Sequence, residues 1–219
     1  MSAVDVKRYI ERTALVDDYF RPDAVLPYGL IVAEVKAAIN TTYDFLCDVN
    51  TFLVERGYGR LEDLLLGNSF TGVLSEVLVK NLADHSATLV RNIRIGGHPD
   101  LIPVGLYPDD TVLRGAEGIE VKASKQSGGW QGHNPEAGWL MVFRYMVDTK
   151  TEPVEARAPM QFVEVLAARL EEADWSFSGR SGASRRTITA SINRDGMAKL
   201  RATPVYRHPD YAVAARRRT

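Results

Sequence analysis

The sequence has little cysteine and no long apolar run. Its 219 residues include one cysteine, Cys47, so an internal disulfide and a multi-cysteine metal site are both excluded. No stretch approaches the roughly 18 consecutive apolar residues that a membrane-spanning helix needs, and the first residues lack the apolar segment of a signal peptide. We therefore expect a cytoplasmic protein without a membrane partner, in which Cys47 is a small buried side chain.

A strong net charge and a nucleotide-binding loop are also absent. The chain carries 27 Lys and Arg residues against 28 Asp and Glu residues, which gives a formal net charge of −1. It has no Gly-x-x-x-x-Gly-Lys motif, so nothing indicates ATP dependence. With 45% hydrophobic and 25% charged residues, the composition is that of a globular protein, and the length fits one domain.

The charges that are present are unevenly distributed. From residue 175 to the end, the chain has ten Lys and Arg residues but only Asp195 and Asp210 as acidic residues. Within 184–207, basic residues alternate with β-branched ones around Asn193-Arg194-Asp195-Gly196, which predicts a basic β-hairpin that turns at these four residues. An ordered positive surface suits contacts with a nucleic acid backbone. A solvated basic tail is the alternative.

The apolar pattern predicts helices first and strands after them. Residues 30–54 and 68–82 place apolar side chains at helical spacing, and another helix is expected at 160–172. Between them lie four short segments with the pattern of strands, the last apolar enough to be central and covered on both faces. These segments are 88–95, 101–106, 118–123 and 139–147. We expect an α/β (α+β) fold with a central mixed β-sheet flanked by helices.

Two acidic residues lie at the open end of one expected hairpin. If the second and third strand segments pair as antiparallel strands with Asp100 opposite Glu120, the turn falls at residues 107–111, where Pro and Asp favour it. Directly opposed residues have Cβ atoms about 5 Å apart. Lys122 is two positions beyond Glu120 and therefore lies on the same face of the strand. Two carboxylates and an ammonium group are predicted to converge; the alternative is a hairpin whose charges are merely decorative.

Such a group of side chains has a specific chemical use. Mg²⁺ binds one or two carboxylates together with water and substrate phosphate, and the ion relieves the repulsion between the carboxylates. The ion activates water and stabilises the charge that develops on phosphorus, while a nearby lysine orients the water or neutralises the oxyanion. The pattern therefore indicates phosphodiester hydrolysis.

Pro99-Asp100 followed by Glu120-Val121-Lys122 resembles the motif of the PD-(D/E)XK nucleases, the superfamily that includes most restriction endonucleases. The resemblance extends over about residues 68–172, with a helix before the motif and an apolar strand after it. It implies a restriction endonuclease-like core in which Asp100 and Glu120 bind Mg²⁺, with Mn²⁺ as a substitute, and Lys122 is the catalytic lysine. Members often add an acidic residue from the preceding helix. Glu76 is the positional candidate, although it lies nearly opposite the apolar stripe of its helix.

Polar side chains beyond Lys122 are candidates for DNA contacts. They come from the Gly-rich loop after this residue and from the basic C-terminal region, and they can reach phosphates or base edges. Trp130 can stack on a base or, alternatively, pack in the core. His98 and His133 lack the spacing of a metal-binding or acid-base pair, so we interpret each as a hydrogen-bonded turn residue. The candidate DNA-binding residues are Lys125, Gln126, Trp130, Gln131, His133, Asn134, Arg180, Arg185, Arg186 and Arg194.

The sequence thus predicts a Mg²⁺-dependent DNA endonuclease, most simply a type II restriction endonuclease that cuts specific double-stranded sites. We expect a single domain over 1–219, with a core at about 68–172, a helical part at 1–67 and a basic, DNA-contacting β segment at 175–219. A homodimer is expected if both strands of a palindrome are cut, with a cognate DNA methyltransferase as functional partner. A repair or junction-resolving nuclease on the same core and a noncatalytic DNA-binding protein are the alternatives.

Overall fold

A six-stranded mixed β-sheet forms the centre of the computed structural model, which describes residues 8–132, 135–177 and 190–211. The strand order is β1-β2-β3-β5-β6-β9; β3 and β5 are parallel, and the other neighbours are antiparallel. These strands are β1 (Leu89–Arg91), β2 (Leu101–Pro103), β3 (Ile119–Ser124), β5 (Gly138–Met146), β6 (Gln161–Leu170) and β9 (Tyr206–Arg207). A smaller sheet, ordered β4-β8-β7, contains β4 (Gln131–Gly132), β8 (Ala190–Ile192) and β7 (Trp175–Phe177).

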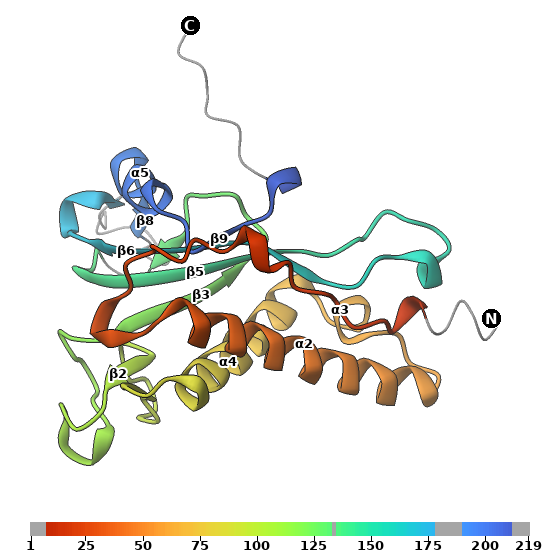
Figure 1. Ribbon diagram of the computed structural model, residues 1–219, viewed down its shortest axis with the longest axis horizontal. Helices are drawn as coiled ribbons and strands as arrows, with labels where there is room; N and C mark the ends of the chain where they lie inside the picture. The colour runs from red at the N-terminus through yellow and green to blue at the C-terminus, as the bar shows by residue number, and fades with distance from the viewer. Residues whose placement is uncertain (1–7, 133–134, 178–189, 212–219) are drawn as a thin grey trace, which may run out of the picture.

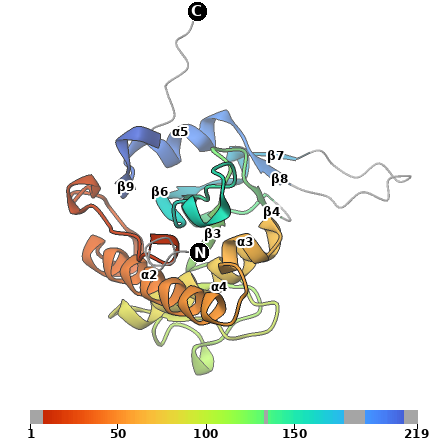
Figure 2. The same cartoon turned by 90° about the vertical axis from the view of Figure 1, so that its right-hand side faces the viewer.

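Helices cover both faces of the central sheet. Figures 1 and 2 show α2 and α4 side by side on one face, and α5 on the other. The α-helices are α2 (Val32–Glu55), α3 (Leu61–Leu64), α4 (Gly67–His85) and α5 (Arg194–Ala202). The expected helices at 30–54 and 68–82 and the mixed α/β fold are thus confirmed. Among the described residues, no helix is both long and apolar enough to cross a membrane.

The central strand β5 separates two hydrophobic cores. Met141, Phe143 and Tyr145 belong to the core under α2 and α4, whereas Leu140 and Val142 belong to a second core with α5 and the small sheet. Successive side chains of a strand point to opposite faces, so an unbroken apolar run is what a strand buried on both faces requires. The prediction of a central, doubly covered strand is confirmed.

The neighbouring strand β3 has a different pattern, because only one of its faces is apolar. Ile119, Val121 and Ala123 are buried in the core under α4. Glu120 and Lys122 point to the opposite face, as the strand period requires, next to Leu140 and Val142 of β5 in the sheet register. The fold therefore presents two charged side chains on one face of a strand whose other face is firmly anchored.

The hairpin between β2 and β3 has the predicted register. Leu101 pairs with Ile119, which is the register that sets Asp100 opposite Glu120. The expected turn is confirmed by the 3-10 turn at Pro108–Asp110. Strand β2 is shorter than the expected 101–106, and β1 is shorter than 88–95, because the chain leaves both strands for the loops that connect them.

The helix expected at 160–172 is wrong, because this segment forms the strand β6. Its apolar residues fit a helical spacing, but Phe162, Val163 and Val165 are aromatic or β-branched and favour a strand. In the fold, β6 pairs with the whole length of β5. Covering the long apolar strand outweighs the local helical preference. The buried pair Arg144 and Glu164, opposite each other in the register, joins the two strands by a contact of 3.2 Å.

The basic hairpin expected around Asn193 is also wrong. Asn193 caps a helix: its side-chain oxygen accepts hydrogen bonds from the backbone N–H groups of Asp195 and Gly196, at 2.9 and 3.0 Å. Asn and Asp are favoured at turns and at helix N-termini for the same reason, a short side chain that bonds nearby backbone. Here Asn193 is a helix cap and not a turn residue, and the residues after it form α5.

A buried ionic cluster fastens the start of α3 to the N-terminal segment. Arg60 is fully buried, and its Nε atom lies 2.9 Å from Oδ2 of Asp63 and 3.6 Å from Oε1 of Glu62. Arg157 contacts the other oxygen of Asp63 at 3.2 Å, and the Tyr9 hydroxyl donates to Asp63 at 2.9 Å. Arg157 also contacts the exposed Glu152 at 2.6 Å, so both guanidinium groups of the cluster are paired with carboxylates.

Candidate active site

The hairpin brings Asp100, Glu120 and Lys122 together. The pairing of β2 with β3 ends at Leu101 and Ile119. The N–H group of Val121, two residues further along the same edge of β3, donates to Oδ2 of Asp100 at 2.8 Å. Lys122 Nζ lies 3.5 Å from Oε1 of Glu120. The two carboxyl groups and the ammonium group converge as predicted. The carboxyl group of Asp100 is held by the backbone of β3, the strand that carries Glu120 and Lys122.

His98 is a member of this site that the sequence reasoning missed. Its Nδ1 atom lies 2.9 Å from Oε2 of Glu120, and its Nε2 atom lies 3.4 Å from Oε2 of Glu136. The interpretation of His98 as a simple turn residue is therefore corrected. A signal was available: His98 precedes Asp100 by two positions, a spacing that puts side chains on one face of extended chain. Glu136 had no such signal, since only the folded chain brings it near.

The carboxyl groups differ in their protonation because their surroundings differ. Burial, and then the neighbouring charge of Glu120, raise the pKa of Asp100 to about 7. Burial also acts to raise the pKa of Glu120, but the hydrogen bond from His98 and the charge of Lys122 outweigh it, and the pKa is lowered. The hydrogen bond to Glu120 in turn raises the pKa of His98. Without a bound cation, the shared proton of the pair therefore belongs to Asp100.

The donor set fits a divalent cation of the Mg²⁺ type. Once Asp100 is ionised, the three carboxyl groups of Asp100, Glu120 and Glu136 outnumber the two cationic groups near them in the described part of the chain, Lys122 and His98. Among the described residues, no group of three or more His, Cys, Asp or Glu side chains is arranged to hold a metal ion. Two carboxylates meet the usual requirement of Mg²⁺, which fills its remaining positions with water and substrate phosphate.

A cleft of about 380 Å³ opens beside Lys122. Its walls come from the first turns of α4, the end of β3 and the loop that follows. At one wall, the hydroxyl groups of Thr71 and Tyr145 are hydrogen-bonded at 2.6 Å. The lining residues are Gly67, Thr71, Lys122, Ala123, Ser124, Lys125, Gln126, Trp130 and Gln131. The cleft is open, and Lys122 and Lys125 are its charged lining residues, which suits an anionic chain.

The candidate DNA-binding residues have different positions. Lys125, Gln126 and Gln131 are exposed and line the cleft. Trp130 is only 3% exposed, lies in the second core and donates from Nε1 to the carbonyl of Gln126 at 3.3 Å. Its ring is committed to packing, so the base-stacking interpretation is wrong and the alternative of a core Trp holds. His133, Asn134, Arg180, Arg185 and Arg186 lie outside the described residues.

The basic C-terminal region is more neutral than its count of charges indicates. Arg194 is exposed and pairs with the adjacent Asp195 at 2.9 Å. Lys199 pairs with Asp174 at 2.6 Å, and Arg207 pairs with the buried Glu164 at 3.0 Å. Carboxylates elsewhere in the fold thus compensate several of these cations, and the exposed positive surface of the described part is smaller than the sequence predicts.

Glu76 does not join the carboxyl pair. It lies on α4, is well exposed, and pairs with Arg91 of β1. The neighbouring Ser75 contacts the site strand: its hydroxyl accepts a hydrogen bond from the N–H group of Ala123 at 3.2 Å. Helix α4 therefore supports β3 from its apolar side, and the expected third acidic ligand is engaged on the surface.

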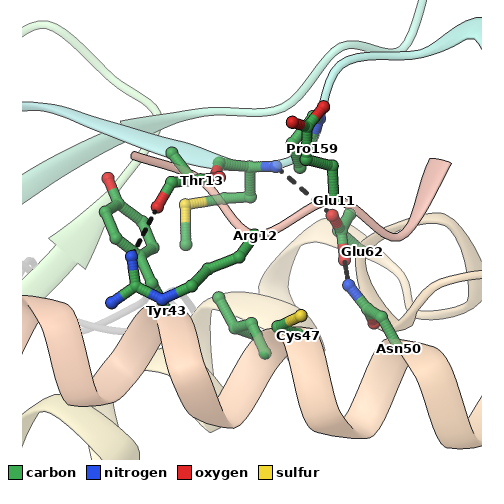
Figure 3. Close-up of a pocket in the computed structure, with 10 residues that line it drawn as sticks. Glu11, Arg12, Thr13, Tyr43, Cys47, Asn50, Glu62 and Pro159 are labelled. Atoms are coloured by element: carbon green, nitrogen blue, oxygen red, sulfur yellow. Dashed lines mark hydrogen bonds between the residues drawn. The ribbon is translucent and has the colours of Figure 1, made fainter. Parts of the chain in front are cut away.

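A second cavity lies away from this site, between α2 and the segment before β6 (Figure 3). Its volume is about 10 Å³, close to the smallest space that holds one water molecule. Glu62 borders it and accepts hydrogen bonds from Asn50 Nδ2 at 2.9 Å and from the N–H group of Met160 at 3.3 Å. Cys47, also in its lining, is half-buried. The cavity is too small for a substrate.

The sequence matches no model of a known protein family and no curated protein. The resemblance to the PD-(D/E)XK nucleases therefore depends on the motif residues themselves and on the site that they form.

Proposed function

We propose that this protein is a Mg²⁺-dependent endonuclease that hydrolyses phosphodiester bonds in double-stranded DNA, most simply as a type II restriction endonuclease acting in the cytoplasm. One observation carries the proposal. Asp100, Glu120 and Lys122 converge at the open end of the β2-β3 hairpin, in the register that their motif spacing predicts, at the edge of a cleft of about 380 Å³.

Each residue has a distinct role in this proposal. Asp100 and Glu120 would hold the ion, with Mn²⁺ as a substitute, and the bound cation would supply activation of water and stabilisation of charge on phosphorus. Lys122, whose Nζ atom lies 3.5 Å from Glu120, would neutralise the developing oxyanion or orient the attacking water. Lys125, Gln126 and Gln131 would contact the phosphates and base edges of the strand in the cleft.

The electrostatics of the site favour a catalytic role for these carboxyl groups over a merely structural one. A carboxyl group that only decorates a surface is well solvated, whereas Asp100 is partly buried beside Glu120 and its pKa is raised to about 7. Such an arrangement disfavours the folded state at neutral pH and is relieved by a cation. Perturbed carboxyl groups next to a cleft are typical of functional sites. This supports an enzyme over the noncatalytic DNA-binding alternative.

The central test is cleavage of unmethylated phage DNA with Mg²⁺. We expect Asp100→Asn and Lys122→Met to lower the cleavage rate by roughly 10²–10³-fold or more, the usual cost of removing a group that stabilises transition-state charge. Asp109→Asn is the matched control: this acid belongs to a similar Pro-Asp pair but lies at the exposed turn, and its variant should cut normally. Binding of DNA in EDTA should be retained by all three variants.

Two results would contradict the proposal. Cleavage by Asp100→Asn and Lys122→Met at the native rate would show that the site is wrongly assigned. Binding of DNA by the native protein without cleavage in Mg²⁺ or Mn²⁺ would favour the noncatalytic alternative.

Sequencing the cut ends separates the two kinds of nuclease. Discrete fragments with one end sequence indicate restriction, whereas cleavage only at branched or damaged DNA indicates a repair or junction-resolving enzyme. For a restriction enzyme we expect a homodimer in solution, since protein symmetry mirrors that of a palindromic site. The expected functional partner is a cognate DNA methyltransferase, encoded by a neighbouring gene.

A further inference from the structure

His98 lies between two carboxylates that come from distant parts of the chain. Its Nδ1 atom is 2.9 Å from Oε2 of Glu120 on β3, and its Nε2 atom is 3.4 Å from Oε2 of Glu136, just before β5. Each ring nitrogen therefore has its own carboxylate neighbour. The ring is about one-third exposed, so the contacts form at the mouth of the site and not in the core.

The backbone holds the ring in this position. The N–H group of His98 donates to the carbonyl of Leu113 at 3.2 Å, and its own carbonyl accepts from the N–H group of Gly115 at 2.8 Å. On the far side, the carbonyl of Glu136 accepts from Trp175 Nε1 at 2.9 Å. The backbones of His98 and Glu136 are thus tied to ordered parts of the fold, which sets the position of the ring before any ligand binds.

The contact matters most for Glu120, because a glutamate has three rotatable side-chain torsions that a strand surface leaves free. His98 holds Oε2, while Lys122 approaches Oε1 at 3.5 Å. Contacts to both oxygens define the direction in which the carboxylate presents its remaining lone pairs. In metal sites, partners behind the ligands orient them in this way, and their loss costs about 10- to 100-fold in metal affinity or activity.

We propose that His98 is a positioning residue that orients Glu120 for binding a divalent cation, and that Glu136 keeps the imidazole in place. The inference rests on the proposed function, because it assigns a task to a group outside the motif of the same site. It goes beyond that function by naming a His-Glu pair that the motif does not include.

Two amide variants separate the ring nitrogens. The side-chain nitrogen of His98→Asn lies near the position of Nδ1 and keeps a donor for Glu120, whereas that of His98→Gln lies near Nε2 and serves Glu136 only. Mn²⁺ binding is measured by titration calorimetry on the full chain, without DNA. We expect His98→Asn to bind Mn²⁺ within about threefold of the native protein, and His98→Gln and His98→Ala to bind it about 10- to 100-fold more weakly.

Controls keep the outcomes apart. His85→Asn changes an exposed histidine that contacts only Thr41 in the hydrogen bonds of the described residues, and it should bind Mn²⁺ normally. Equal affinities for His98→Asn and His98→Gln, or native affinity for His98→Ala, would overturn the inference. If Glu120→Gln also binds Mn²⁺ as the native protein does, the metal site itself is wrong, and the proposed function fails with it. Because the two amide variants are compared with each other, a general loss of folding in His98→Ala does not decide the result.

Discussion

The molecule contains two clusters of charged side chains that solve the problem of burying charge in different ways. Around Arg60, each guanidinium group is paired with carboxylates, and the side chains of Arg60, Glu62 and Asp63 are at most 8% exposed. Around Glu120, three carboxyl groups face one lysine and one histidine, with side chains about one-quarter to one-third exposed. The first cluster needs no ligand, whereas the second one keeps a proton on Asp100 whose place a bound cation could take, and its Lys122 lines the cleft.

The difference shows what each cluster does for the protein. A buried and balanced cluster fixes how segments meet, and breaking it leaves an uncompensated charge. An unbalanced cluster at a cleft costs stability, which proteins tolerate where a ligand or substrate supplies the missing charge. We therefore expect stability to depend on the Arg60 cluster and activity on the Glu120 cluster.

The same substitution made in both clusters should give opposite effects. Asp63→Asn leaves the fully buried Arg60 with Glu62 as its remaining carboxylate contact, and we expect a loss of about 3 kcal/mol, or roughly 6–12 °C in Tm, with normal cleavage per folded molecule. Asp100→Asn removes repulsion from Glu120, so Tm should stay the same or rise although cleavage is lost. Thermal unfolding in EDTA, read beside cleavage assays in Mg²⁺, checks both. A large fall in Tm for Asp100→Asn would mean that both clusters are structural.

The pH dependence of this comparison has a definite sign. The pKa of Asp100 is raised from an ordinary value near 4 to about 7, so folding disfavours its ionised form. Between these two values the unfolded chain loses its proton and the native protein keeps it, and stability therefore falls as the pH rises. In EDTA, the Tm advantage of Asp100→Asn over the native protein should be small near pH 4 and grow up to about pH 7. An advantage that is constant with pH would contradict the assigned repulsion.

The two clusters also differ in how far sequence reasoning reaches them. The Asp100, Glu120 and Lys122 convergence was predicted because it depends on local rules: strand alternation, a turn rich in Pro and Asp, and the register that they define. His98 shares this local logic, since it is two residues from Asp100. Glu136 does not, because it reaches the site only through the packing of the loop that precedes β5.

The errors of prediction have the same origin. The segment after Met160 has apolar spacing that suits a helix or a strand, and only its pairing with β5 decides between them. Asn193 suits a turn or a helix cap, and the contacts of α5 with the second core decide again. Trp130 was open between DNA stacking and packing for the same reason. Local pattern gave the elements and the motif, whereas non-local packing determined which side chains remain free.

A smaller effect is expected at the cleft wall, where Lys125 is exposed and has no ion pair with the described residues. Lys125→Ala should weaken binding of double-stranded DNA several-fold in EDTA and reduce the slope of log K against log salt by about 1, because one phosphate contact is lost. Arg194→Ala is the matched control, since its guanidinium is already paired with Asp195. A change of the same size in both variants would show that the cleft is not the DNA surface.

The smallest effect is expected at Glu76, the acidic candidate from the preceding helix that the fold leaves outside the cluster. Its partner Arg91 is exposed as well, and exposed ion pairs contribute little to stability because water and salt screen them. Glu76→Gln should cut DNA within about twofold of the native rate and unfold within about 2 °C of the native Tm. The cleavage rate and the Tm together distinguish a catalytic role from a structural one. A loss of cleavage of about 100-fold at unchanged Tm would make Glu76 a third ligand that moves inward when the cation binds. The cluster around Glu120 would then include an acidic residue of α4, and the comparison between the two clusters would have to count Glu76 among the site residues.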